Sequence, residues 1–127
     1  MKEKEWKVKE YNSNGLLLFE GEYSNGIRNG KGKEYNYNGE LIFEGVISGG
    51  ERWNGIGKQY NEGGQLIFEG GYVNGYKNGK GKEYNYYGEL IFEGYFFEGE
   101  RWNGYGKEYI YNELIYEGKY LYGSKLC

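Results

Sequence analysis

Residues 33–47 read Lys33-Glu34-Tyr35-Asn36-Tyr37-Asn38-Gly39-Glu40-Leu41-Ile42-Phe43-Glu44-Gly45-Val46-Ile47, and this stretch decides the fold. Two runs of β-forming residues, 33–37 and 41–47, flank the dipeptide Asn38-Gly39. Asn-Gly between such runs is a strong hairpin signal, because a type I′ turn requires positive φ at both of its central residues. We therefore expect two antiparallel strands joined by a type I′ turn.

The same pattern repeats along the whole chain of 127 residues. A triplet of an aromatic residue, Glu and Gly returns at steps of 24, 25, 24 and 24 residues, and a Gly-Lys-Glu-Tyr or Gly-Lys-Gln-Tyr marker lies between successive triplets. Self-similarity at a short fixed period indicates a repeat architecture. Turns equivalent to Asn38-Gly39 are expected at Asn14-Gly15, Gly63-Gly64 and Tyr87-Gly88.

A second period of 49 residues is superimposed on the first, since residues 30–57 and 79–106 share 22 identities in 28 positions. The connection between hairpins is rich in Gly, and we expect it to be the longer loop of each repeat. In alternate repeats it carries one extra residue beside Trp53 or Trp102. The second copy is the more aromatic one, through the changes Val46/Tyr95, Ile47/Phe96, Ser48/Phe97 and Ile56/Tyr105.

These patterns predict an all-β fold, an elongated single-layer antiparallel β-meander of about ten strands built from tandem hairpin repeats. Helix is disfavoured by the 25 glycines and by the period of two along the strands. A single domain, residues 1–127, is expected. Its parts are an N-terminal cap strand at 1–15, repeats at 16–39, 40–64, 65–88 and 89–112, and a partial repeat at 113–127.

Alternation along the second strand of each hairpin sorts its residues onto two faces. Leu41, Phe43, Gly45 and Ile47 share one face, which we expect to be packed. A glycine inside a strand lets a neighbouring ring lie against bare backbone. The structural positions of the repeat are therefore Phe19, Gly21, Phe43, Gly45, Phe68, Gly70, Phe92, Gly94, Tyr116 and Gly118.

Composition and charge exclude several classes of function. The chain has no His or Asp and a single cysteine, Cys127, so we expect no enzyme, no metal site and no cofactor. The formal net charge is −3 and the cations are interleaved with Glu, which argues against nucleic acid and disfavours membrane lipid. No apolar stretch is long enough for a signal peptide or a membrane span, so a cytoplasmic protein is expected.

Two sets of side chains are candidates for binding a partner. The column Tyr35, Tyr60, Tyr84 and Tyr109 forms either an aromatic groove for a peptide or the core itself. Trp53 and Trp102, with Arg52 and Arg101 before them, have the composition of a binding hot spot. The alternative is that each Trp folds back onto its loop under its Arg. The glutamates of the triplets are expected to be neutralised by lysines on neighbouring strands, namely Lys33, Lys58, Lys82 and Lys107.

The repeat resembles the MORN family, whose unit is an aromatic residue, any residue, Gly, any residue, an aromatic residue, and then spaced glycines. Phe19-Glu20-Gly21-Glu22-Tyr23-Ser24-Asn25-Gly26, followed by Gly30-Lys31-Gly32, fits this pattern at every position. The Leu-Ile-Phe lead-in is similar to the bacterial variant of the repeat, some of whose proteins carry an antitoxin-type label. The resemblance implies a gutter-like antiparallel sheet and protein–protein association, often as a homodimer, with phospholipid binding in some members.

We therefore expect a non-catalytic protein-interaction or scaffold module that binds through the aromatic groove and the Trp-containing loops. The alternatives are a phospholipid- or glycan-binding module and an antitoxin-type partner of a toxin. The expected partner is a protein. Homodimers could form through a sheet edge or through the apolar C-terminal end at Tyr120-Leu121-Tyr122-Gly123, whereas the charged segment from Lys2 to Glu5 is expected to cap the N-terminal end.

Overall fold

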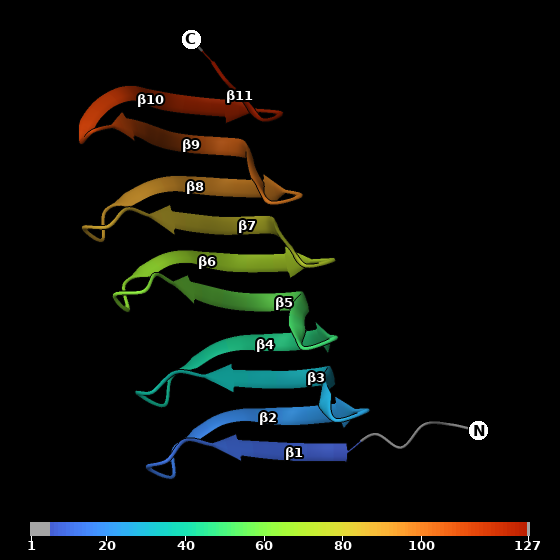
Figure 1. The fold of residues 1–127 in the computed structure, drawn as a ribbon. Helices are drawn as coiled ribbons and strands as arrows, with labels where there is room; N and C mark the ends of the chain where they lie inside the picture. Colours follow the sequence, from blue (N-terminus) through green and yellow to red (C-terminus); the bar gives the residue numbers. More distant parts are fainter. Residues whose placement is uncertain (1–5, 127) are drawn as a thin grey trace. The chain divides into compact units, whose positions relative to one another are not determined.

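The computed structural model describes residues 6–126, so the charged segment from Lys2 to Glu5 and Cys127 lie outside the described residues. The all-β prediction is confirmed, because the described residues form one open antiparallel meander of eleven strands without a helix. Each strand neighbours the next one along the chain (Figure 1). About ten strands were expected, and the additional one is a two-residue strand at Ser124–Lys125.

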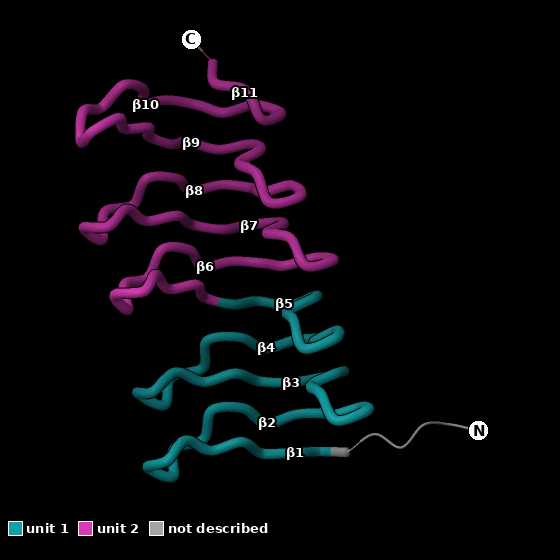
Figure 2. Tube along the Cα trace, in the orientation of Figure 1, with its two compact units in different colours: residues 1–57 teal, residues 58–127 magenta. Residues whose placement is uncertain are grey.

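The strands group into two compact units, residues 1–57 and 58–127 (Figure 2). Unit 1 contains the first four strands and most of the fifth, and unit 2 contains the remainder. The strands are β1 (Trp6–Tyr11), β2 (Leu17–Ser24), β3 (Ile27–Tyr35), β4 (Leu41–Ser48), β5 (Glu51–Tyr60), β6 (Leu66–Val73), β7 (Tyr76–Tyr84), β8 (Leu90–Phe97), β9 (Glu100–Ile110), β10 (Glu113–Leu121) and β11 (Ser124–Lys125).

The turn between β3 and β4 is not the predicted type I′ turn. Its φ is positive at Gly39 but not at Asn38. The side-chain Oδ1 of Asn36 accepts hydrogen bonds from the backbone N–H groups of Asn38 and Glu40, at 2.9 and 3.0 Å. An Asn side chain bonded in this way fixes a four-residue turn in which only the last position needs the left-handed region. Asn12, Asn61 and Asn85 hold the equivalent turns.

Two-residue turns with positive φ at both positions lie instead at the other ends of the strands. The expectation that these connections are the longer loops is wrong. Asn and Gly tolerate the left-handed region, and such turns match the twist of paired strands. The turns are Asn25-Gly26, Gly49-Gly50, Asn74-Gly75, Glu98-Gly99 and Tyr122-Gly123, and a further one, Tyr111-Asn112, joins β9 to β10.

The core of unit 1 lies on one face of its strands. Phe19 and Phe43 are fully buried, as is Ile47. A Cβ atom added at Gly21 or Gly32 would lie 2.8 or 2.7 Å from the Phe19 ring, so the ring packs against bare backbone as the sequence predicts. Leu41 was expected on this face but is exposed, because the register shifts between Leu41 and Phe43 and ends the alternation there.

The core of unit 2 is a chain of aromatic rings in edge-to-face contact. The Phe96 ring lies 5.1 Å from Phe68 and 5.2 Å from Phe92, between centroids. Phe92 in turn lies 5.4 Å from Tyr120, which is buried. Such pairs contribute about 0.5–1.5 kcal/mol each beyond the area they bury. Tyr120, which was expected at an uncapped end, therefore belongs to the core.

Candidate functional site

Arg52 and Arg101, two of the predicted binding residues, lie over the core rings. The guanidinium carbons lie 5.0 Å from the centres of the Phe43 and Phe92 rings, respectively. Arg52 forms an ion pair with Glu34 at 3.1 Å, and Arg101 forms one with Glu83 at 2.7 Å. The two arginines therefore cover the packed face and link β5 to β3 and β9 to β7 across the strand between them.

A cation over an aromatic ring recurs in each repeat. Arg28 covers Phe19 and forms an ion pair with Glu10 at 2.7 Å. The hydrogen bond from Arg28 lowers the pKa of Glu10, although burial acts in the opposite direction. A cation over a ring contributes about 0.5–2 kcal/mol, depending on how far it is desolvated. We call the set the ring-covering cations: Arg28, Arg52, Lys77, Arg101 and Lys125.

The tyrosine column lies beside the triplet glutamates. The hydroxyl of Tyr35 donates a hydrogen bond to Glu20, and that of Tyr84 donates one to Glu69, both at 2.8 Å. Burial and this hydrogen bond raise the pKa of Tyr84 to about 12. Tyr35 and Tyr84 thus have fixed hydroxyl groups and half-buried rings. Of the other two predicted residues, Tyr60 is half-buried and Tyr109 is exposed.

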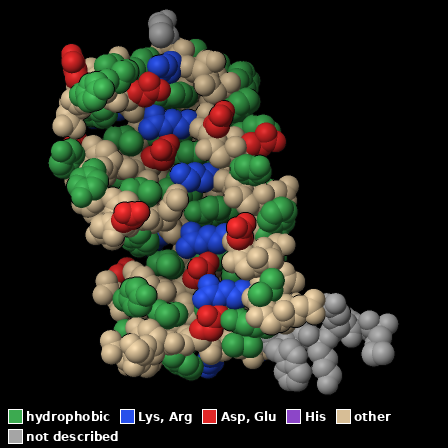
Figure 3. Space-filling model, in the orientation of Figure 1, with side chains coloured by type: hydrophobic (Ala, Val, Ile, Leu, Met, Phe, Trp, Pro, Cys, Tyr) green, Lys and Arg blue, Asp and Glu red, His purple; other side chains and the backbone are tan. Residues whose placement is uncertain are grey.

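Lysines and glutamates alternate across neighbouring strands on the face opposite the packed one. The register pairs Lys9 with Glu20, Glu20 with Lys33, and Lys33 with Glu44 in unit 1. Basic and acidic side chains alternate along the middle of the face in Figure 3. The Lys33–Glu44 pair is 3.9 Å apart, and Lys82–Glu93 and Lys107–Glu117 in unit 2 are 4.0 Å apart. The expected neutralisation of the triplet glutamates is confirmed for these pairs.

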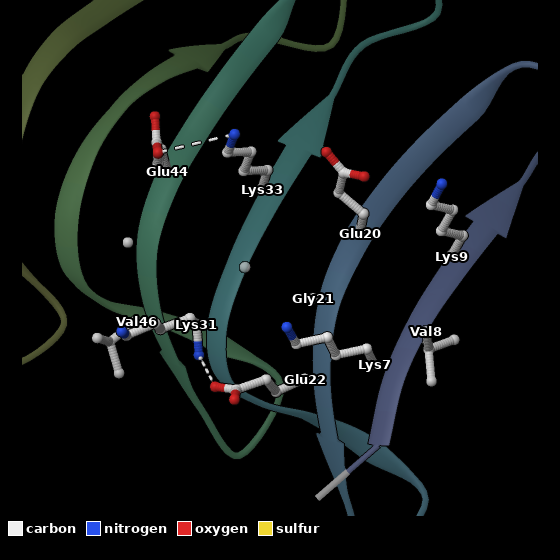
Figure 4. Close-up of a pocket in the computed structure, with 12 residues that line it drawn as sticks. Lys7, Val8, Lys9, Glu20, Gly21, Glu22, Lys31, Lys33, Glu44 and Val46 are labelled. Atoms are coloured by element: carbon white, nitrogen blue, oxygen red, sulfur yellow. Dashed lines mark hydrogen bonds and ion pairs between the residues drawn. The ribbon is translucent and has the colours of Figure 1, made fainter.

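In unit 1 this charged face forms an open hollow over β1–β4 (Figure 4). A second row, Lys7, Glu22, Lys31 and Val46, runs beside the first row of charges in the close-up. Opposite charges are already neighbours within the hollow, so it has no block of one sign that would hold a phosphate or a metal ion. No group of three potential metal-ligating side chains occurs among residues 6–126.

Trp53 is the unpaired residue of a β-bulge. In the pairing of β4 with β5, Val46 faces Asn54 and Ile47 faces Arg52, which leaves Trp53 unpaired in a β-bulge. Trp102 occupies the equivalent bulge between β8 and β9. A bulge re-aims the side chain of the extra residue and bends the strand. The bulge also explains why Arg52 reaches the packed face one residue before the Trp.

Trp102 is the centre of an aromatic surface in unit 2. Its ring lies 5.1 Å from the Phe97 ring and 6.2 Å from the Tyr122 ring. The backbone N–H of Gly123 donates to the carbonyl of Trp102 at 3.0 Å, and that of Tyr122 donates to Oδ1 of Asn103 at 2.8 Å. Phe97 is 46% and Tyr122 68% exposed. We call Phe97, Trp102 and Tyr122 the Trp102 patch.

The described part of unit 1, residues 6–57, lacks the counterpart of this patch. Ser48 occupies the position of Phe97, and Trp53 is 39% exposed. Phe97 was not among the residues predicted to bind a partner, and Tyr122 was predicted only as part of the apolar C-terminal end that could form a homodimer. The greater aromatic content of the second copy could have indicated Phe97 as a binding residue. Tyr122 comes from the following hairpin, and only the docking of that turn onto β9 brings it to Trp102.

The chain matches no protein-family model, and no curated protein matches it either. Within residues 6–126, no helix has the length and apolar character needed to cross a membrane. The surfaces described above are therefore the basis for a proposal about function.

Proposed function

We propose that the chain is a non-catalytic interaction module, built from MORN-type repeats, that holds a protein partner on the Trp102 patch. The observation that carries this proposal is that Phe97 and Tyr122 remain largely exposed while both pack against Trp102. Trp and Tyr are enriched among the residues that dominate binding energy at protein interfaces. The Trp53 loop and the tyrosine column would then be secondary contacts.

The backbone around the patch favours binding, because its rings need little ordering when a partner arrives. The hydrogen bonds from Tyr122 and Gly123 to β9 hold the turn before any partner is bound. Preorganisation of this kind reduces the entropic cost of association. Burying the exposed parts of two large rings would contribute about 2–4 kcal/mol at 25 cal/mol per Å².

Two substitutions test the patch without introducing a residue that is foreign to the fold. Phe97→Ser copies Ser48 of the first duplicate, and Tyr122→Asn copies the Asn25-Gly26 turn. Affinity purification of the tagged chain from its source cell, followed by mass spectrometry, should yield a partner that both variants lose. The control is Tyr111→Asn, which removes a 98% exposed ring from another turn. Equal recovery of the partner by all four proteins would disprove the proposal.

The same variants distinguish the alternative functions. We expect no binding in flotation with anionic liposomes and none on a glycan array. Binding to either that disappears in Phe97→Ser would replace the protein partner by a lipid or a glycan. If the captured partner is a toxin, the antitoxin alternative applies, with the same patch as its site. The proposed setting is the cytoplasm, which fractionation of the source cell would check.

A further inference from the structure

The rim of the Trp102 patch is acidic. Phe97 is the direct cross-strand partner of Glu100, and Glu98 follows Phe97 in the two-residue turn. Directly opposed residues of an antiparallel pair have Cβ atoms about 4.5–5.5 Å apart, so the Glu100 and Phe97 side chains leave the same face of the sheet as direct neighbours. Both glutamates are exposed.

These two carboxylates differ from four of the eight other glutamates in the same unit. Glu83, Glu93, Glu108 and Glu117 each form an ion pair with a Lys or Arg on another strand. Among the described residues, neither Glu98 nor Glu100 forms an ion pair. Two negative charges that have no ion-pair partner within residues 6–126 therefore border the exposed rings.

The nearest cation along the chain cannot fill this role. Arg101 is directed to the packed face, where it lies over Phe92 and pairs with Glu83. Its neighbour Trp102 is on the bulge and packs against Phe97. A flat aromatic ring beside a carboxylate is a favourable environment for a guanidinium group, which stacks on the ring and forms hydrogen bonds to the acid.

We propose that the Trp102 patch recognises a basic segment of its partner, with an arginine side chain stacked on the Phe97 and Trp102 rings and paired with Glu100. This inference rests on the proposed function, since it names the chemistry of the partner for the same patch. Charge complementarity selects a basic partner over an acidic one, because a partner carboxylate would meet Glu98 and Glu100 at the rim.

The test uses two synthetic peptides as probes, acetyl-Gly-Arg-Leu-Arg-Gly-amide and the same peptide with Glu in place of both Arg. The full-length ¹⁵N-labelled chain is titrated with each, and the indole N–H signal of Trp102 is followed, assigned with a Trp102→Phe variant. The arginine peptide should shift this signal in a saturable manner, and the glutamate peptide should not. Equal shifts with both peptides, or no shift with the arginine peptide, would overturn the inference.

Charge variants provide the matched controls. Glu98→Gly copies Gly49 of the first duplicate and Glu100→Gln keeps the shape of the side chain, so both should fold normally. Together they should weaken binding of the arginine peptide about tenfold at low salt. Glu113→Gln, on β10, should have no effect. Unchanged affinity in the double variant would contradict the role of the acidic rim.

The capture experiment separates this inference from the proposed function. If Phe97→Ser loses the partner but the double variant Glu98→Gly with Glu100→Gln retains it, the patch binds a protein and the basic chemistry is wrong. If both variants retain the partner, the proposed function itself fails. If both lose it, the arginine inference is supported together with the site.

Discussion

The ammonium nitrogen of Lys77 lies 4.5 Å from the centre of the Phe68 ring, and this cation has no ion-pair partner among the described residues. The other ring-covering cations each pair with a glutamate. For Arg28, Arg52 and Arg101 that glutamate stands 18 residues earlier in the chain, where Lys77 has Gln59 instead. Burial accordingly lowers the pKa of Lys77, with a smaller opposing effect from Glu83.

Placing a glutamate at position 59, where the other repeats have one, should stabilise the protein. Gln59→Glu gives Lys77 the carboxylate that the other repeats have, so we expect a gain of roughly 0.5–1 kcal/mol in the free energy of unfolding at pH 7. Urea denaturation would measure it, and the gain should vanish when Lys77→Met is added, since the double variant has no pair to form. A gain that persists in the double variant would assign the effect to something other than Lys77.

The pH dependence of stability should report the same site. The pKa of Lys77 is lower in the folded chain than in the unfolded one. Between those two values the unfolded chain binds more protons, so this group makes stability rise as the pH increases through that alkaline window. Urea denaturation across the window would measure the slope. The Gln59→Glu variant should lose part of this rise, and identical slopes in the two proteins would contradict the assignment.

Tyr84 should have the opposite effect at high pH. Its pKa is raised to about 12, so the folded chain retains the phenolic proton above the ordinary tyrosine pKa of about 10. Its contribution to stability is complete below the unfolded pKa and is lost as the pH rises through the folded one. Absorbance at the phenolate band should show that this group ionises late. Because the pKa values of Tyr23, Tyr35 and Tyr120 are raised too, Tyr84→Phe should reduce the late absorbance change by the share of one tyrosine, and it should cost about 0.5–1.5 kcal/mol at neutral pH.

The fold was predictable because the same sequence signals for strands and turns recur in every repeat. The hairpins, the packed Phe positions and the ring-against-glycine contacts all follow from alternation and from the period of the triplets. The turn types could not be read from Asn-Gly alone. In residues 36–39 a second asparagine, Asn36, is positioned to bond the backbone, and that bond determines which residue takes positive φ.

The candidate site was predictable only in part. Trp102 was predicted as a binding residue because a Trp beside an Arg is typical of binding hot spots, and it is the centre of the patch. Arg101 stood out for the same reason, but the bulge places it over Phe92, on the packed face. Tyr122 belongs to another hairpin, so no local pattern connects it with Trp102. When one turn docks on another strand, it brings together side chains whose contact cannot be predicted from the repeat period of the sequence.

The glycines under the rings should differ sharply from other glycines in their tolerance of substitution. Gly32→Ala would place a Cβ atom 2.7 Å from the Phe19 ring, which must move. We expect a loss of about 1–3 kcal/mol in the free energy of unfolding. Gly63→Ala is the control, because the nearest atom there is 3.4 Å away on a side chain and φ is not positive. Similar losses in the two variants, measured by thermal unfolding, would contradict the packing described for Phe19.

The four-residue turn between β3 and β4 and a type I′ turn would differ in which asparagine is the more sensitive to substitution. Asn36→Ala removes the oxygen that accepts the N–H groups of Asn38 and Glu40, so we expect a loss of about 1 kcal/mol, as for other side-chain caps of backbone donors. Asn38→Ala should cost much less, because φ is not positive at Asn38. In a type I′ turn Asn38 would have positive φ, and its replacement by Ala would be the damaging change. Urea denaturation of both variants decides between the two turns.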